Sequence, residues 1–279
     1  MSTFILQAPA KLNLSLRVIG KRADGFHEID TIMVKLPGLA DVIEFDNAEA
    51  FSFRCDDPSL PADDSNLVVK AVRAYQAASG IPCEFAITLK KAIPHGAGLG
   101  GGSSDAATTL LGLNKLHKDQ LSAEQLLEIA ATLGSDIPFF LKPGCARCTG
   151  RGEVIENLPS PAPLRVLLLK PAFSVPTPDA YGRWSGSTEL PGVLYAAQAI
   201  DGFTLINDLE RPVFGKHRFL AELKQWLLKR DECSAALLAG SGSTMLGVLR
   251  EGADTTELMR AARHEIDPGL WLWTGLTCA

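Results

Sequence analysis

Residues 94–107 place five glycines and two serines directly before an apolar helical pattern, which strongly restricts what this region can form. Glycine has no Cβ atom, so a glycine-rich loop can adopt positive φ angles and bring several backbone N–H groups against a polyanion. A helix that follows at once, with Ser103 or Ser104 as its N-cap, presents its positive end to the same anion. The stretch therefore predicts a phosphate-binding loop for a nucleotide.

Other interpretations of the loop remain open at this point. The G-x-G-x-x-G spacing from Gly96 to Gly101 matches the dinucleotide fingerprint, which would indicate a nicotinamide-dependent oxidoreductase. That fingerprint needs an acidic residue about 20 positions later, at the end of a second strand; residues 115–120 instead form a polar loop. A Walker loop needs a lysine, but Gly102 leads directly to Ser103. A purely structural turn is typical of a lone glycine pair rather than of five glycines.

The apolar periodicity predicts the class of fold. Strict alternation over residues 11–18 indicates a half-buried strand, with Lys11 and Asn13 side by side on a face that we expect to be exposed. Further strands are predicted at residues 32–36, 43–45, 51–55, 85–89, 166–169, 245–249 and 270–273, and helices at residues 67–78, 105–116, 122–133, 218–229 and 255–264. Strands come before helices rather than alternating in βαβ units, so we expect an α+β fold.

Length and proline spacing predict two domains. A chain of 279 residues is long enough for two cores. Three prolines within residues 159–163 interrupt regular structure. We therefore expect one domain over residues 1–158 and a second over residues 164–279.

Composition excludes several classes of protein. A net charge of −5 without a basic cluster argues against a nucleic-acid surface. The apolar runs are far shorter than the roughly 20 residues of a membrane span, and the N-terminus lacks a signal-peptide pattern. The single Cys145-x-x-Cys148 pair is expected on a strand and turn, not at a metal or redox site. We expect a cytoplasmic protein that acts on a small molecule and binds neither nucleic acid nor membrane; its oligomeric state stays open.

Six segments resemble motifs of the GHMP kinases, a superfamily of small-molecule kinases. In chain order they are residues 8–14, 21–27, 94–107, 133–140, 207–210 and 238–244. The first, third and last are similar to the three motifs of the superfamily, and the others are similar to its branch that phosphorylates a cytidylylated methylerythritol in the non-mevalonate isoprenoid pathway. The resemblance implies an ATP-dependent kinase with a ribosomal-protein-S5-like N-terminal half and a ferredoxin-like C-terminal half. Another small-alcohol kinase, of the mevalonate or homoserine type, is the alternative within the superfamily.

The resemblance implies that Lys11 and Asp136 form the catalytic pair. Phosphoryl transfer requires positive charge around the moving group and a base near the attacking hydroxyl. Asp136 follows Gly134 and precedes Ile137, so we expect it to begin a short helix whose positive end stabilises a carboxylate. The residues alone leave alternatives open: Asp136 could be an N-cap without a catalytic role, and Lys11 could be a solvated lysine. The protein would then be a nucleotide-binding module without catalysis.

The resemblance also assigns residues to ATP and to the acceptor. ATP is expected at Asn66 and at Pro94, His95, Gly96, Ala97, Gly98, Leu99, Gly100, Gly101, Gly102, Ser103 and Ser104. The acceptor is expected at Asn13, Phe26, His27, Thr177 and Gly242. Phe26 keeps a surface on which cytosine can stack but lacks the hydroxyl of the tyrosine usual in the family. Mg²⁺ is expected with ATP, and no protein ligand is evident beyond a candidate hydroxyl on Ser104.

Overall fold

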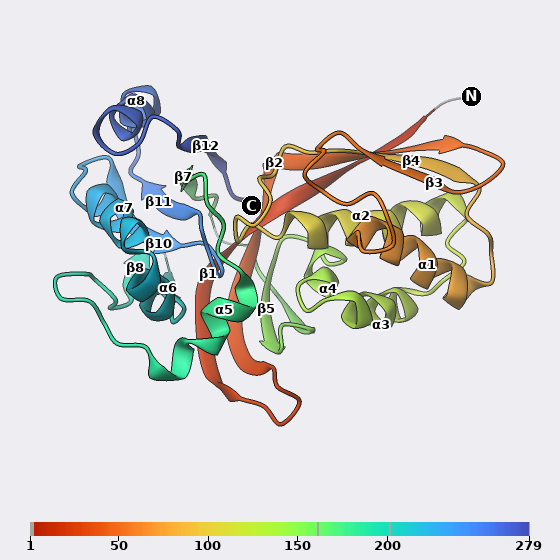
Figure 1. Ribbon diagram of the computed structural model, residues 1–279, viewed down its shortest axis with the longest axis horizontal. Helices are drawn as coiled ribbons and strands as arrows, with labels where there is room; N and C mark the ends of the chain where they lie inside the picture. Colours follow the sequence, from red (N-terminus) through yellow and green to blue (C-terminus); the bar gives the residue numbers. More distant parts are fainter. Residues whose placement is uncertain (1–2, 161, 201, 279) are drawn as a thin grey trace.

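Strands and helices both contribute to the part of the chain that the computed structural model describes, residues 3–160, 162–200 and 202–278 (Figure 1). The strands are β1 (Phe4–Lys21), β2 (His27–Asn47), β3 (Ser52–Cys55), β4 (Phe85–Lys90), β5 (Cys145–Gly150), β6 (Val154–Leu158), β7 (Arg165–Lys170), β8 (Gln198–Ile200), β9 (Phe203–Asn207), β10 (Cys233–Leu238), β11 (Met245–Leu249) and β12 (Trp271–Leu276). The helices are α1 (Leu67–Ser79), α2 (Gly101–Leu116), α3 (Ala123–Leu133), α4 (Ile137–Phe140), α5 (Thr177–Gly182), α6 (Glu210–Lys216), α7 (Arg218–Leu228) and α8 (Thr255–Glu265), with a 3-10 turn at Trp184–Gly186. The predicted α+β class is confirmed.

Strand β2 organises the larger sheet because it is long enough to have different neighbours along its length. Strand β1 runs antiparallel to it along one edge. On the other edge, residues 29–34 of β2 pair with β5 and residues 42–47 pair with β4. The strand order is β3-β4-β2-β1-β9-β8, with β6 beside β5. Helices α1 to α4 lie along one side of this sheet, in the lobe that Figure 1 draws on the right.

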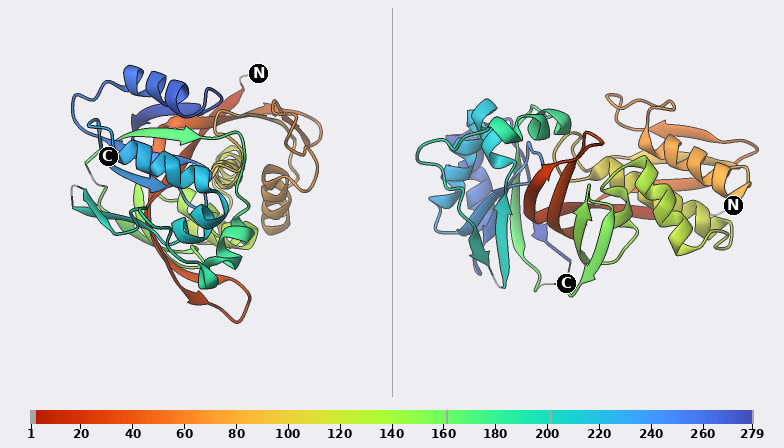
Figure 2. Two further views of the ribbon diagram at one scale, coloured as in Figure 1. Left: turned by 60° about the vertical axis from the view of Figure 1, so that its left-hand side comes forward. Right: turned by 90° about the horizontal axis from the view of Figure 1, so that it is seen from below.

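The smaller sheet forms the second lobe, in the order β10-β11-β7-β12 with antiparallel neighbours. Helices α7 and α8 pack against it through an apolar cluster that includes Leu223 and Leu258. A second cluster joins Leu12 and Val34 of the larger sheet to Leu168 of the smaller one, and β9 pairs in parallel with β1. The two lobes therefore share a core, and strands β1 and β2 lie between them (Figure 2). The division into domains at residues 158 and 164 stays a prediction.

Side chains cap two of the four helices α1 to α4. Asn66 caps α1, and Ser122 forms a capping box with Gln125 at the start of α3, which ends at Leu133 with Gly134 as its C-cap. Helix α2, however, begins earlier than expected, at Gly101, and the prediction of Ser103 or Ser104 as N-cap was wrong. The N-cap is Gly100, whose φ of 71° turns the chain into the helix and places both serines within its first turns.

The two cysteines of the C-x-x-C pair lie on strand β5, as predicted, and serve different parts of the core. Because they are three residues apart on a strand, they face opposite sides. Cys148 belongs to the cluster under α1 to α4, and Cys145 belongs to the cluster shared between the lobes. Within the described ranges, no group of three or more His, Cys, Asp or Glu side chains is arranged to hold a metal ion, and no helix is long and apolar enough to cross a membrane.

A buried ion pair joins α6 to α7. Lys224 Nζ donates to Glu210 Oε2 over 2.6 Å, and Glu210 Oε1 accepts from the backbone N–H of Leu238. Burial raises the pKa of Glu210, and Lys224 opposes that rise. Replacing Lys224 with Met leaves a buried carboxylate without its cation, so we expect urea denaturation to give a free energy of unfolding lower by about 3–5 kcal/mol. Adding Glu210→Gln should restore most of the loss; an equal loss in the double variant would show that charge is not its cause.

Candidate active site

A cleft of about 480 Å³ lies where β1, the loop before α2 and the turn after β10 meet. Of the predicted ATP-binding residues, Asn66 and the loop from Pro94 to Ser103 line it, whereas Ser104 is fully buried and does not. On the other side the cleft is lined by Lys11, Asn13, Leu16, Ile29, Asp136, Thr177, Tyr181, Gly240 and Ser241. The structure thus brings most of the residues predicted for ATP and for catalysis to one cavity.

Three glycines of the loop have the positive φ angles that the sequence predicted: 62° at Gly96, 77° at Gly98 and 71° at Gly100. A Cβ atom on Gly98 would lie 2.0 Å from the carbonyl oxygen of Ala239, and one on Gly100 would lie 2.9 Å from Cγ of Lys11. Only glycine therefore fits between β1 and the turn after β10. The N–H groups at the start of α2 have no partner within the helix and are available to an anion.

Lys11 and Asp136, which both line the cleft, form an ion pair with Lys11 Nζ 3.3 Å from Asp136 Oδ2. Lys11 Nζ also donates to Asn13 Oδ1 over 2.6 Å, and Asn13 Nδ2 donates to Thr31 Oγ1 over 2.8 Å. The expectation that Lys11 and Asn13 lie on an exposed face was wrong, since only 4% and 3% of their surfaces are exposed. The loop and the turn at Gly240 cover that face of β1, so the ammonium group is buried with defined partners.

The side chain of Asp136 does not cap the helix that follows it. It occupies the N-cap position of α4, as predicted, but its side chain makes no capping hydrogen bond there. About a third of the side chain is exposed, which leaves the carboxylate open to the cleft. Its carboxylate is therefore paired with Lys11 and does not cap α4.

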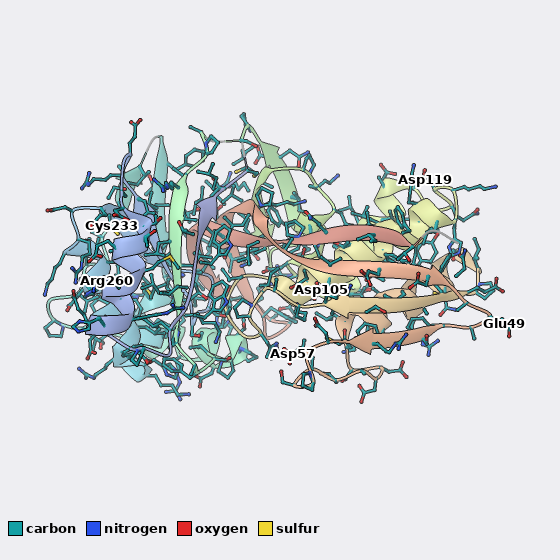
Figure 3. All side chains as sticks on the ribbon, turned by 90° about the horizontal axis from the view of Figure 1, so that it is seen from above. Glu49, Asp57, Asp105, Asp119, Cys233 and Arg260 are labelled. Atoms are coloured by element: carbon teal, nitrogen blue, oxygen red, sulfur yellow. The ribbon has the colours of Figure 1, made fainter. Side chains whose placement is uncertain are left out.

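A buried charge cluster fixes the beginning of the loop, and the sequence analysis missed it. Lys91 forms ion pairs with Asp41 and with Asp105, and Asp41 accepts hydrogen bonds from the backbone N–H groups of Ala92 and Ile93. Burial raises the pKa of Asp105, and Lys91 opposes that rise. Asp105 lies well inside the molecule, unlike Glu49 at its tip (Figure 3). The sequence signal that could have indicated this cluster was Lys91, three residues before the first residue of the loop, Pro94.

The residues expected to hold the acceptor base lie beside the cleft rather than on its lining. Phe26 follows the turn at Gly25, where φ is 87°, and its ring is half exposed with the guanidinium of Arg151 4.7 Å from its centroid. The His27 ring lies 5.3 Å from that of Tyr181, and burial lowers the pKa of His27, which favours a neutral imidazole. Sequence reasoning missed Tyr181, although it lies four residues after Thr177 on the same face of α5.

Thr177, on the same helix as Tyr181, contacts the turn after β10. Its hydroxyl is 2.8 Å from that of Ser241, and both residues line the cleft. Gly242 does not line the cleft; it lies behind Ser241, where a Cβ atom would come 3.1 Å from Leu238. The turn therefore faces the cavity through Gly240 and Ser241.

Similarity to known proteins agrees with this arrangement. Residues 66–144 match the family described as GHMP kinases N terminal domain. A protein from Methylacidiphilum infernorum (isolate V4), named 4-diphosphocytidyl-2-C-methyl-D-erythritol kinase, is 37% identical over 276 residues, which cover 95% of this chain and 93% of that protein. A crystal structure of 4-(cytidine 5'-diphospho)-2C-methyl-D-erythritol kinase matches with a TM-score of 0.79 and 32% identity, covering 99% of this chain and 100% of that chain. Homoserine kinase from Cytophaga hutchinsonii matches with a TM-score of 0.68 and 16% identity, over 100% of this chain and 95% of that chain, which shows a common fold alone.

These similarities decide between the interpretations of the glycine-rich loop. A dinucleotide-binding loop joins two parallel neighbours of one sheet, whereas here the next strand after the loop, β5, pairs antiparallel with β2 and does not lie beside β4. The resemblance of the six segments to GHMP kinases is confirmed by matches that cover nearly the whole chain. The chain belongs to the 4-diphosphocytidyl-2-C-methyl-D-erythritol kinase family of the GHMP kinases.

Proposed function

We propose that this protein transfers the γ-phosphoryl group of ATP to the 2-hydroxyl of 4-diphosphocytidyl-2-C-methyl-D-erythritol, in the non-mevalonate isoprenoid pathway. The observation that carries the proposal is the Lys11–Asp136 pair, which lines the same cleft as a glycine-rich loop at a helix N-terminus. The name of the Methylacidiphilum relative, which matches over most of both chains, supports this choice of acceptor.

Asp136 is the general base of the proposed reaction. Its carboxylate accepts the proton of the acceptor hydroxyl while the hydroxyl oxygen bonds to the γ-phosphorus, and the bond from that phosphorus to the bridging oxygen breaks to release ADP. Lys11 supplies positive charge beside the carboxylate and the moving phosphoryl group, and Asn13 holds its direction. Charge that is already in place stabilises the transition state without reorganisation.

The loop from Pro94 to Ser104 is the proposed site of the ATP phosphates. Glycines with positive φ angles allow its backbone to approach an anion closely, and the start of α2 adds the positive end of a 16-residue helix. Asn66 also lines the cleft and is the proposed neighbour of the adenine. The expected cofactor is therefore ATP, bound with its γ-phosphate toward Lys11 and Asp136.

Magnesium is the proposed metal, and the oxygen donors near the loop fit it. The hydroxyl of Ser104 and Oδ1 of Asp105 are buried without a hydrogen-bond partner in the described structure. Mg²⁺ takes oxygen ligands and commonly receives most of them from phosphates and water, so it needs few from the protein. Ser104 would hold the ion, which when bound neutralises charge on the β- and γ-phosphate oxygens.

A comparison of acceptors tests the proposed function. Purified protein is assayed for ADP release with 4-diphosphocytidyl-2-C-methyl-D-erythritol, with mevalonate and with homoserine. We expect kcat/KM for the cytidylylated acceptor to exceed the other two values by at least about a thousandfold, because neither alternative carries a base for the Phe26 and His27 region. Comparable rates with mevalonate or homoserine would contradict the proposal and favour another small-alcohol kinase.

The cytidine part of the acceptor is predicted to bind at Phe26. Replacing Phe26 with Ala should raise the free energy of acceptor binding by about 1–3 kcal/mol, the range for one base-stacking contact. Phe51→Ala is the matched control, because Phe51 also has an arginine, Arg73, 5.3 Å from its ring centroid but packs against the apolar cluster under α1 to α4, not next to His27 and Tyr181. Calorimetric titration with the acceptor measures both variants. Equal affinities for Phe26→Ala and Phe51→Ala would place the cytosine elsewhere.

A further inference from the structure

The side chain of Asn207, at the end of β9, bridges two carbonyl groups of the turn that faces the active site. Its Nδ2 atom donates to the carbonyl oxygens of Leu238 and Gly240 over 2.8 and 2.7 Å, and its Oδ1 accepts from the backbone N–H of Leu209 over 2.9 Å. Only 4% of the residue is exposed, and it does not line the cleft. Both amide hydrogens are thus used to hold the turn from inside the protein.

One of the two carbonyl groups that Asn207 binds belongs to Gly240, which lies next to Lys11. A Cβ atom on Gly240 would lie 2.9 Å from the carbonyl oxygen of Gly98, 3.3 Å from Lys11 Nζ and 3.4 Å from Asn13 Oδ1. Gly240 therefore packs against the phosphate loop and against both members of the Lys11–Asn13 contact, with no room for a methyl group. A shift of this turn by a fraction of an ångström changes the position of the ammonium group.

The backbone around Asn207 is attached to the strand that carries Lys11. Asn207 pairs with Leu16 in the parallel contact between β9 and β1, and the next residue, Asp208, donates its N–H to the carbonyl oxygen of Leu16 over 2.9 Å. The Asp208 carboxylate accepts from the backbone N–H of Val18. Asn207 thus connects β1, through the backbone, to the turn at Gly240, through its side chain.

We propose that Asn207 is a positioning residue for phosphoryl transfer: it holds the turn at Gly240 against Lys11 and Asn13, and so fixes the ammonium group relative to Asp136. It acts through that turn and not through the substrates. The inference rests on the proposed function for its effect on catalysis, while its effect on the structure of the site can be measured without any substrate.

The test compares Asn207→Ala with Gln198→Ala. Gln198 is a matched control because its amide also bridges the β8–β9 hairpin to β10, donating to the carbonyl oxygen of Ala236 and accepting from its N–H, away from the cleft. We expect Asn207→Ala to lower kcat by about tenfold to a hundredfold with KM for ATP nearly unchanged, the size of effect that a small misplacement of catalytic groups produces. Gln198→Ala should stay within about twofold of the unchanged protein in kcat, since its bridge does not reach the site.

Hydrogen exchange supplies the readout that needs no activity. In Asn207→Ala, peptides covering residues 96–100 and 238–244 should exchange faster, including the Thr244 N–H that donates to the carbonyl oxygen of Ala97. In Gln198→Ala those peptides should keep their protection. Equal kcat values for the two variants, or equal exchange in these peptides, would overturn the positioning role. If Asn207→Ala does not fold, Asn207→Ser, which keeps one donor, replaces it in both measurements.

The two proposals fail in distinguishable ways. If the unchanged protein does not phosphorylate the cytidylylated acceptor, the proposed function is wrong, and the exchange comparison still decides whether Asn207 holds the turn. If the unchanged protein is active and both variants match it in kcat, the proposed function stands and the role of Asn207 is wrong.

Discussion

Asp136→Asn should lower kcat by about a hundredfold or more while the affinity for ATP changes little. Asparagine keeps the shape of the side chain but cannot accept the hydroxyl proton, and it removes the charge that lies 3.3 Å from Lys11 Nζ. Because the Asp136 side chain makes no capping hydrogen bond, the start of α4 should not depend on the carboxylate. The buried ammonium group of Lys11 does lose its counter-charge, so urea denaturation of the variant is measured beside its kinetics. Steady-state kinetics with a calorimetric titration of an ATP analogue measures both quantities.

Asp30→Asn is the control for that variant. Asp30 is also an aspartate paired with a cation, with its Oδ2 accepting from Arg147 Nη2 over 2.6 Å, but it does not line the cleft. Its replacement should leave kcat within about twofold of the original value, as expected for a surface ion pair. Near-normal turnover in folded Asp136→Asn would remove Asp136 from the role of base.

Gly98→Ala should weaken binding of a non-hydrolysable ATP analogue by at least about tenfold, because the phosphate loop can no longer pack against the turn after β10. The new Cβ atom would lie 2.0 Å from the carbonyl oxygen of Ala239, and the backbone φ of 77° disfavours any side chain. The left-handed conformation alone costs about 1–2 kcal/mol, and overpacking adds about 1–3 kcal/mol. Calorimetry gives the affinity and urea denaturation gives the stability.

Gly192→Ala separates the two causes. Gly192 has nearly the same φ, 76°, but a Cβ atom there would meet nothing within 4 Å. It should therefore lose only the conformational part of the stability and bind the analogue normally. Equal affinities of Gly98→Ala and Gly192→Ala for the analogue would mean that binding of the ATP phosphates does not depend on the conformation of this loop.

Local signals made much of the fold predictable from the sequence. Apolar periodicity located α1 and α3, and a continuous apolar run located β11 over residues 245–249, as the structure has it. Strands β6, β8, β9 and β10 were not predicted: β8 is three residues long, and the place of β9 beside β1 depends on contacts far apart in the chain. Periodicity reports which face of an element is apolar, not which element will cover it.

The same limit explains the errors at the candidate site. Lys11 was correctly placed beside Asn13 on one face of β1, but its burial depends on the loop at Gly98 and the turn at Gly240, which no local pattern reveals. The N-cap of α2 was assigned to serine because serine is the commoner cap, whereas the tight approach at Gly100 needs glycine. Tyr181 was missed because its contact with His27 joins segments more than a hundred residues apart.

The most direct test of the central proposal is the position of the transferred phosphate. The protein is incubated with ATP and 4-diphosphocytidyl-2-C-methyl-D-erythritol, and the product is examined by phosphorus and carbon NMR. We expect one new phosphate monoester, coupled to the C2 carbon of the methylerythritol unit and formed in equal amount with ADP, at a rate lower by about a hundredfold or more with Asp136→Asn. A phosphate on another oxygen, or ATP consumed without a phosphorylated acceptor, would contradict the account.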